Sequence, residues 1–150
     1  MIAKEIIEKT EIRNLGIDAT YEVMPFLKLL NPDKSESIIK TRLWQMMAYD
    51  NYQLFGFYNN FELVGIIGGW TLTKIYSGKQ FEIDNFIIDD KLQSKGYGKQ
   101  LLGLIQTWAI KNDYQSLELD VYSANNKALK FYMTSGFNIS GFHMYKKLTT

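Results

Sequence analysis

A chain of 150 residues that is 46% hydrophobic and 15% aromatic can bury a substantial core, and this composition excludes a disordered chain. The 17 basic and 16 acidic residues leave a net charge of +1, which gives no bulk attraction to nucleic acid or to an anionic membrane. Because the chain has no cysteine, disulfides, thiolate metal sites and a cysteine acyl intermediate are excluded. We therefore expect one domain over residues 1–150, with neither nucleic acid nor a membrane as a partner.

The first third of the chain predicts one strand followed by two helices. Asn14 and Ser35 are residue types that cap helices, and each precedes a run of apolar residues. Pro25 should kink or split the first of these helices, because proline lacks the N–H that the helix needs. The expected elements are a strand over residues 5–12, a helix over residues 15–30 and a helix over residues 36–48.

The rest of the chain predicts a hairpin and then alternating helices and strands. Asn59 and Asn60 form a turn suited to left-handed backbone between two runs with a period of two. Antiparallel strands followed by a β-α-β-α stretch predict a mixed, mostly antiparallel sheet with helices on its faces, an α/β (α+β) fold. The expected elements are strands over residues 53–58, 62–72 and 80–89, a helix from near Gly98, a strand over 117–121, a helix from Asn125 to Gly136, and closing strands over 137–139 and 142–148.

Residues 84–104 carry the strongest functional signal, a strand that leads through a glycine loop into an amphipathic helix. Gly96 and Gly98 lack a Cβ, so the backbone there can bend sharply and approach a ligand closely. The N-terminus of the following helix presents N–H groups and the positive end of the helix dipole. This arrangement predicts a site for phosphate or pyrophosphate.

Three kinds of phosphate loop compete for this segment. A Walker A loop would need glycine at Gln93 and Ser or Thr at Gln100. A dinucleotide fingerprint would use both glycines but needs a small residue at Leu101, although acidic residues do follow about 20 positions later. The remaining pattern runs from Gln93 to Gly98, QSKGYG.

A second motif, NNKALKFYMTSGF, runs from Asn125 to Phe137. Together with the loop it resembles the GCN5-related N-acetyltransferases, the GNAT superfamily. The loop matches the family's Arg/Gln-x-x-Gly-x-Gly/Ala pattern. The second segment matches Asn-x-x-Ala-x-x-Phe/Leu-Tyr-x-x-x-Gly-Phe. The likeness is close over residues 81–148 and only general before them. It implies a GNAT fold, with a mixed sheet of six to seven strands flanked by about four helices.

The resemblance implies an acyltransferase that binds acetyl-CoA (coenzyme A) in the loop and between two splayed strands. Backbone amides of the loop would hold the pyrophosphate, and backbone near Ile87 and Ile88 would polarise the thioester carbonyl. Asn125 would contact the pantetheine arm as well as cap its helix. The cofactor-binding residues implied in this way are Phe86, Ile87, Ile88, Gln93, Ser94, Lys95, Gly96, Tyr97, Gly98, Lys99, Asn125, Ala128 and Phe131.

Three side chains are candidates for the acid–base chemistry of acetyl transfer. Tyr132 is the candidate acid, because a phenol is protonated at neutral pH and the resemblance places it beside the sulfur of the coenzyme. Glu82 and Asp84 lie in an otherwise apolar strand and are the candidate bases. Strict alternation would put both on one face with Phe86, and would put Asn85 on the other.

The expected function is N-acetyl transfer from acetyl-CoA to a primary amine, by direct attack in a ternary complex. The alternative is a non-catalytic module of the same fold that binds acyl-CoA. The acceptor is a small-molecule or peptide amine. Five aromatic residues are candidates for a wall around it: Trp44, Tyr49, Tyr52, Trp70 and Tyr76.

Metal, compartment and oligomeric state rest on weaker signals. The only histidine, His143, has no clustered carboxylate in the sequence, so no metal site is expected. Charges interrupt the apolar residues at the N-terminus, so neither a secretory signal nor a membrane span is expected. The expected compartment is the cytoplasm, and a homodimer is an open alternative to a monomer.

Overall fold

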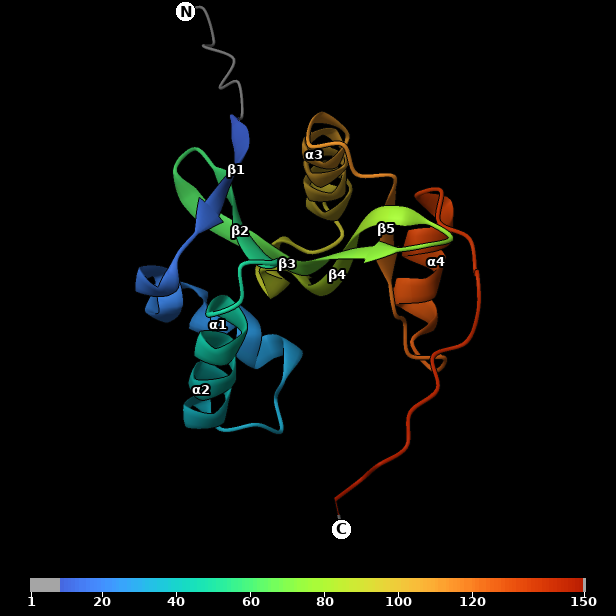
Figure 1. Ribbon diagram of the computed structural model, residues 1–150. Helices are drawn as coiled ribbons and strands as arrows, with labels where there is room; N and C mark the ends of the chain where they lie inside the picture. The colour runs from blue at the N-terminus through green and yellow to red at the C-terminus, as the bar shows by residue number, and fades with distance from the viewer. Residues whose placement is uncertain (1–8, 150) are drawn as a thin grey trace, which may run out of the picture. The chain divides into compact units, whose positions relative to one another are not determined.

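The computed structural model describes residues 9–149 of the chain (Figure 1). These residues divide into two compact units, one ending at Glu118 and the other beginning at Leu119. The expected first strand over residues 5–12 lies partly outside the described residues.

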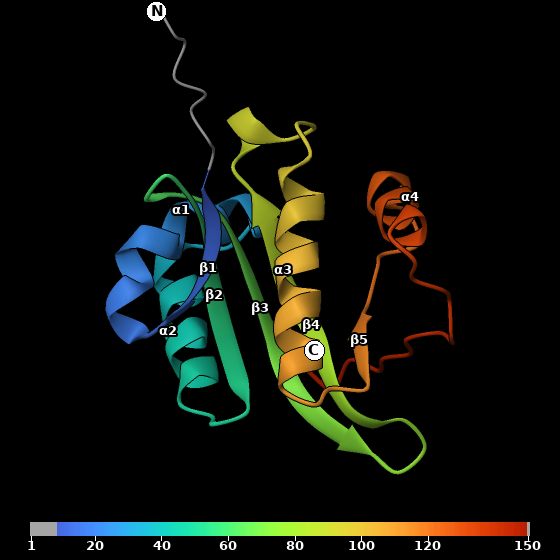
Figure 2. The same ribbon diagram turned by 90° about the horizontal axis from the view of Figure 1, so that it is seen from above.

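The first unit is built on a sheet with the strand order β1-β2-β3-β4-β5 (Figure 2). Strands β1 to β4 form an antiparallel meander, in which each strand pairs with the next. Strand β5 runs in the same direction as β4, so the sheet is mixed (Figure 2). The strands are β1 (Thr10–Leu15), β2 (Tyr52–Asn59), β3 (Glu62–Lys74), β4 (Gly78–Ile88) and β5 (Ser116–Leu119).

The hairpin between β2 and β3 confirms the expected turn. Its φ angles are positive at Asn60 (48°) and Phe61 (72°), so the left-handed backbone lies one residue later than expected. Asparagine adopts this conformation more easily than most residues, which is why the turn could be read from the sequence.

The sheet has five strands within residues 9–149, and the expectation of six to seven is wrong. The two missing strands are the closing pair, because residues 137–149 have no regular secondary structure. The side chains of Phe142 and Met144 are 94% and 89% exposed. Alternating apolar residues indicate a strand only where a neighbouring strand supplies hydrogen-bond partners, and none does so in the described part of the chain.

Residues 9–149 contain four α-helices. The segment expected as one helix over residues 15–30 divides instead into a 3-10 turn at Ile17–Ala19 and a helix that begins at Thr20. Asn14 does not cap this helix, because it lies in β1 opposite Phe55. Pro25 is accommodated inside the helix, at the loss of one backbone hydrogen bond. The helices are α1 (Thr20–Leu30), α2 (Glu36–Met47), α3 (Tyr97–Lys111) and α4 (Asn126–Thr134).

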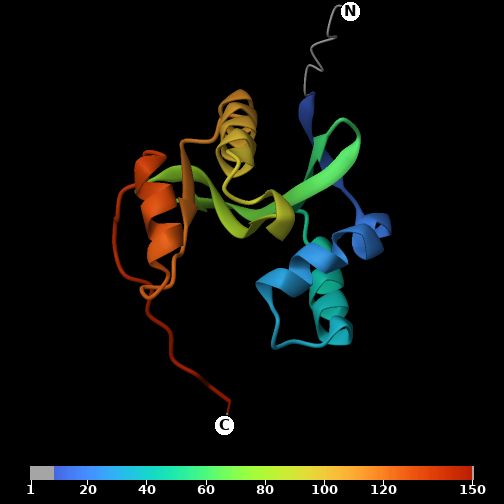
Figure 3. The ribbon, with the colours of Figure 1, turned by 180° about the vertical axis from the view of Figure 1, so that it is seen from behind.

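Helices cover both faces of the sheet in the first unit. Helices α1 and α2 lie on one face and α3 on the other (Figures 1 and 3). On the α3 face, the Trp108 ring packs against Phe55 at 4.8 Å and Phe81 at 5.1 Å between centroids. The core on the α1 and α2 face comprises Ala19, Val23, Met24, Phe26, Leu27, Ile39, Leu43, Tyr52, Leu54 and Ile66.

The second unit contains α4 and the residues after it. Asn125 caps α4, because its Oδ1 accepts a hydrogen bond from the Ala128 amide at 3.1 Å. Gly136 follows the helix with φ of 94°, and the Phe137 amide donates to the Tyr132 carbonyl at 3.0 Å. These contacts confirm the helix boundaries expected from the sequence.

Among the described residues, no helix has the length and apolar content that crossing a bilayer requires. The same residues contain no group of three or more His, Asp or Glu side chains that could hold a metal ion.

Candidate active site

The glycine loop leads from β4 to α3 and is open to solvent. Gly96 is the N-cap of α3 and has φ of 87°, in the left-handed region that favours glycine. Apart from Gly96 and its neighbours along the chain, no atom of residues 9–149 lies within 4 Å of the position that a Cβ on Gly96 would occupy. Gly96 makes no side-chain cap for α3, and the first-turn N–H groups of a helix are the groups that an anion site uses.

The side chain of Gln93 holds the loop against the end of β4. Its Nε2 donates a hydrogen bond to the carbonyl of Ile88 at 3.0 Å. Asp89 fixes the turn that follows β4, since its Oδ1 accepts from the Lys91 amide at 2.9 Å. The glutamine at the first motif position thus shapes the loop with its side chain, while the loop's main chain faces outward.

The side chain of Tyr97 is directed toward the sheet. Its hydroxyl accepts a hydrogen bond from Asn59 Nδ2 at 3.0 Å, and its ring lies 6.1 Å from that of Phe57. Lys95 and Lys99, by contrast, are exposed on the loop and the first turn of α3. Of the expected cofactor-binding residues here, Tyr97 thus packs its side chain against the sheet, whereas the two lysines are exposed.

A bulge at Asp84 changes which residues share a face of β4. The register with β3 passes from Gly68 opposite Asn85 to Gly69 opposite Ile83, which leaves Asp84 as the extra residue. The side chains of Asp84 and Asn85 consequently lie on the same face, with Asn85 Nδ2 3.5 Å from Asp84 Oδ2. The expectation that Asn85 points to the opposite face is wrong, because it assumed unbroken alternation.

The bulge also changes the face of β4 on which the Ile87 side chain lies. It packs against the core under α1 and α2, the face that carries Asp84, and is paired with Ile66 of β3. Ile88 is 7% exposed, and Phe86 is half-buried opposite Ile67. The side chains at this end of β4 are largely committed to packing, so the segment offers mainly its backbone to a ligand.

Two carboxylates and three aromatic rings meet on the α2 side of β4. We call Tyr49, Tyr52, Trp70, Glu82 and Asp84 the acidic–aromatic cluster. Trp70 pairs with Glu82 across β3 and β4, and its indole Nε1 donates to Asp84 Oδ2 at 3.3 Å. The Trp70 ring lies 4.8 Å from Tyr52 and 5.9 Å from Tyr49, between centroids. Three of the five aromatic residues that the sequence offered for a wall around the acceptor therefore contact one another.

Of the other two aromatic residues, Trp44 lines the same hollow as Tyr49 and Tyr52, and Tyr76 lies in the turn after β3. Trp44 donates to the Thr20 hydroxyl at 3.0 Å and carries Lys40 over its ring at 4.7 Å. Tyr76 is 84% exposed in the turn after β3, with Lys74 Nζ 5.8 Å from its ring centroid.

Two buried, neutral side chains belong to the cluster or contact it. Gln80 is fully buried and donates to Glu82 Oε2 at 3.1 Å. Tyr52 is 6% exposed, and burial raises the pKa of its phenol, so it remains neutral. Sequence analysis missed Gln80 and the bulge; the adjacent glycines of β3 were a signal for the bulge, since glycine inside a strand often marks one.

Gly68 leaves the room that the Tyr52 hydroxyl occupies. A Cβ on this glycine would lie 2.4 Å from the Tyr52 oxygen. Asn85 Nδ2 donates to the same oxygen at 3.4 Å. The phenol hydroxyl thereby lies beside Asn85, the residue that follows Asp84 in β4.

The candidate acid, Tyr132, belongs to the second unit. Burial raises the pKa of Tyr132 to about 12, so its hydroxyl keeps its proton at neutral pH. Its ring packs between Phe131 at 5.2 Å and Phe137 at 5.5 Å, between centroids. In the same unit, His143 Nδ1 lies 3.1 Å from Asp120 Oδ2, a contact that the sequence did not indicate.

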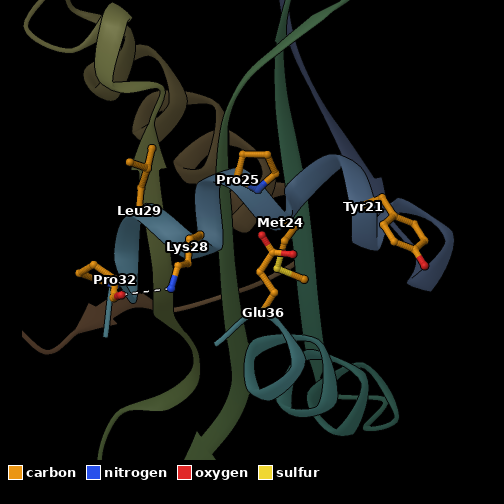
Figure 4. Close-up of a pocket in the computed structure, with 7 residues that line it drawn as sticks. All are labelled: Tyr21, Met24, Pro25, Lys28, Leu29, Pro32 and Glu36. Carbon is orange, nitrogen blue, oxygen red and sulfur yellow. Dashed lines mark hydrogen bonds between the residues drawn. The ribbon is translucent and has the colours of Figure 1, made fainter. Parts of the chain in front are cut away.

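A hollow of the first unit lies apart from the acidic–aromatic cluster. It has a volume of about 550 Å³ and is mainly apolar (Figure 4). Lys28 reaches along its edge and donates to the Pro32 carbonyl at 3.1 Å. A second hollow of about 500 Å³ includes Tyr49 and Tyr52 in its wall. The lining of the first is Tyr21, Met24, Pro25, Lys28, Leu29, Pro32 and Glu36.

Comparison with known proteins agrees with these features. A family model described as "Acetyltransferase (GNAT) family" matches residues 23–137, well over half of the chain. A Bacillus subtilis (strain 168) protein described as "Uncharacterized N-acetyltransferase YhdJ" is 26% identical over 122 residues, which are 81% of this chain and 86% of that protein.

Solved structures share the fold at low identity. An aminoglycoside N-acetyltransferase, AAC(6')-Iy, in complex with CoA matches with a TM-score of 0.79 and 14% identity, covering 95% of this chain and 97% of that chain. A ribosomal-protein-alanine N-acetyltransferase from Brucella melitensis biovar Abortus 2308 has a TM-score of 0.79 and 14% identity, with coverage of 94% and 100%. At this identity the likeness concerns the fold alone.

Proposed function

Because this chain belongs to the GNAT acetyltransferase family, we propose that it moves an acetyl group from acetyl-CoA to a primary amine in a ternary complex. The observation that carries the proposal is the layout of β4 and the loop after it. The strand bears Glu82 and Asp84 and then leads directly into a solvent-open glycine loop at the start of α3. One strand thereby carries the candidate bases and leads to the candidate phosphate site.

The loop has the features that a diphosphate requires. The left-handed backbone at Gly96 and the clear space around it allow the main chain to approach two phosphates. Lys95 and Lys99 are exposed beside it and add positive charge. The related AAC(6')-Iy structure contains CoA, which supports acetyl-CoA as the acyl donor here. The acetyl-CoA would supply the activated thioester.

The acceptor must lose a proton before its nitrogen can attack. Glu82 is our preferred base, because it is half-buried and held by Gln80, while Asp84 is exposed and remains the alternative. The carboxylate takes one proton from the ammonium, the amine nitrogen bonds to the thioester carbon, and the carbon–sulfur bond breaks as the nitrogen gives up a second proton, which balances the proton that the thiolate takes up. The leaving thiolate then takes a proton.

We assign protonation of the thiolate to Tyr132. With its pKa raised to about 12 by burial, the phenol is fully protonated at neutral pH. An ordinary thiol has a pKa of about 8.5, so complete transfer from this phenol is uphill. The larger part of its contribution is therefore a hydrogen bond to the sulfur as negative charge develops there.

Two measurements test the proposal and separate it from a non-catalytic acyl-CoA-binding module. Thermal unfolding with CoA, NAD(H) or ATP identifies the ligand, since a ligand at 100 times its dissociation constant stabilises by about 2.7 kcal/mol. Release of free thiol from acetyl-CoA in the presence of amines then reports turnover. Stabilisation by CoA with no thiol release for any amine would favour the binding module, and stabilisation by NAD(H) alone would refute both.

A further inference from the structure

The first turn of α3, residues 97–100, follows the glycine loop directly and has one side chain directed toward the sheet. Lys99 and Gln100 are exposed and Gly98 has no side chain, whereas Tyr97 is half-buried. The buried side chains that anchor the rest of the helix begin about one turn later, at Leu101. The position of this turn against the sheet therefore depends on what the Tyr97 side chain contacts.

Two residues of β2 contact Tyr97. Its ring lies 6.1 Å from that of the fully buried Phe57, and its hydroxyl accepts a hydrogen bond from Asn59 Nδ2 at 3.0 Å. Phe57 and Asn59 are two residues apart, so their side chains lie on the same face of the strand. Phe55, on this face as well, packs against Trp108 in the later part of α3. Strand β2 thus contacts α3 both along its length and in its first turn.

Asn59 is a fixed partner for the Tyr97 hydroxyl. It is the last residue of β2 and pairs with Thr10 of β1 and Glu62 of β3, so neighbouring strands hold its backbone on both sides. Asn60, which follows it, is tied to the residue before β1. The Asn60 amide donates to the Lys9 carbonyl at 3.0 Å, and its Oδ1 accepts from the Lys9 amide at 3.1 Å. The side chain of Asn59 therefore projects from a well-supported part of the sheet.

The amide of Asn59 depends on this contact. The side chain is half-buried, and its Oδ1 is buried without a hydrogen-bond partner within residues 9–149. Its Nδ2 donates to the Tyr97 hydroxyl. Because a polar group that loses its partner away from solvent is costly, the amide and the phenol favour the arrangement in which they meet.

We propose that Asn59 is a positioning residue for the diphosphate: through the Tyr97 hydroxyl it fixes the first turn of α3 and the glycine loop that leads into it. This inference rests on the proposed function, which assigns that loop to CoA. A loop that is held in its binding geometry before the ligand arrives loses less conformational freedom on binding. Without the hydrogen bond, the ligand itself must order the turn, so CoA binds more weakly.

Calorimetric titration of the full chain with CoA measures this effect without turnover. In Tyr97→Phe, which removes only the hydroxyl, the dissociation constant for CoA should rise at least about threefold, as expected for the loss of one hydrogen bond. Tyr58→Phe is the matched control, because the Tyr58 hydroxyl donates to Glu22 of α1 at 3.1 Å, on the face of the sheet opposite α3. An unchanged dissociation constant in Tyr97→Phe, or an equal rise in Tyr58→Phe, would overturn the inference.

A double-mutant cycle tests whether Asn59 acts through Tyr97. Asn59→Ala should weaken CoA binding by a similar factor, and Asn59→Ala/Tyr97→Phe should bind CoA about as weakly as the weaker single variant. Losses that multiply would show two independent effects and would contradict the pairing. Tyr97→Phe keeps the ring and its contact with Phe57, so its titration decides the question even if Asn59→Ala does not fold.

Kinetics separate positioning from a general loss of structure. With an amine that is acetylated, KM for acetyl-CoA should rise in Tyr97→Phe while kcat at saturating acetyl-CoA stays unchanged, because only binding is weakened. A lower kcat with an unchanged KM would indicate a smaller folded fraction and would overturn the positioning role. Absence of CoA binding by the wild type contradicts the proposed function. CoA binding by the wild type that Tyr97→Phe and Asn59→Ala leave unchanged contradicts only this inference.

Discussion

Substitution of Gly96 by alanine separates the backbone requirement of the loop from its ligand contact. The φ angle of 87° is left-handed, and an L-residue there costs about 1–2 kcal/mol. Beyond its neighbours along the chain, no atom of residues 9–149 lies within 4 Å of the new Cβ, so no packing penalty is added. Gly136 is a matched control, since it has φ of 94° and equally clear space but lies after α4. Both variants should therefore lose similar stability.

The two variants should differ in their response to CoA. For a chain of this size, 1–2 kcal/mol lowers Tm by roughly 2–8 °C in each apo protein. CoA at 100 times the wild-type dissociation constant stabilises by about 2.7 kcal/mol, and a tenfold loss of affinity removes about half of that. The CoA-induced shift should be at least halved in Gly96→Ala and preserved in Gly136→Ala. A full shift in Gly96→Ala would refute the assignment of the loop to the diphosphate.

Three further predictions test the packing and the chemistry. Gly68→Ala should lower the free energy of unfolding by about 1–3 kcal/mol, because its Cβ would overlap the Tyr52 hydroxyl. In denaturant unfolding, the double variant Gly68→Ala/Tyr52→Phe should recover part of this loss. No recovery would contradict the placement of the phenol. Asn125→Ala should lower the free energy of unfolding by about 0.5–2 kcal/mol, because the helix cap is lost. Asn125→Ser keeps a capping side chain, so it should keep the stability but weaken CoA binding through the lost amide. Normal CoA binding by Asn125→Ser would show that Asn125 acts only as a cap. Tyr132→Phe should lower kcat and spare CoA affinity. Because the folded state holds the Tyr132 proton more tightly, with a pKa raised to about 12, its contribution to stability is complete below about pH 10 and is lost as the pH rises toward 12. Tm between pH 9 and 11 should accordingly fall less steeply in Tyr132→Phe than in wild type, and parallel slopes would contradict the burial of this phenol.

Features with a local cause could be predicted from the sequence. Ser35 caps α2 as expected, with Oγ accepting from the Ile38 amide at 3.3 Å. Asn125 caps α4 in the same way. These contacts involve residues three apart, so the residue type nearly determines them. The glycine loop also depends on its own residues, and it lies between β4 and α3 where the pattern placed it.

Features with a distant cause could not be predicted. The bulge at Asp84 depends on the register of β3, where Gly68 and Gly69 make room for side chains on both faces. It brings Asn85 beside Asp84, which alternation along one strand cannot anticipate. The burial of Gln80 and its contact with Glu82 likewise depend on the assembled sheet. The positions of these site residues emerge from pairing between strands.

The expected closing strands show the limit of periodicity. Residues 142–148 alternate well enough to predict a strand, yet Phe142 and Leu148 are 94% and 90% exposed. A sequence pattern specifies which side chains would share a face, whereas the pairing partner is a property of the folded chain. The same reasoning explains Asn14, whose cap chemistry is overridden by its pairing with Phe55.

A crystal structure with CoA tests the central claim most directly. The account predicts that main-chain N–H groups between Gln93 and Gly98 donate hydrogen bonds to the two phosphates, and that the cofactor's sulfur lies within hydrogen-bond distance of the Tyr132 hydroxyl. Phosphates bound away from this loop would contradict it.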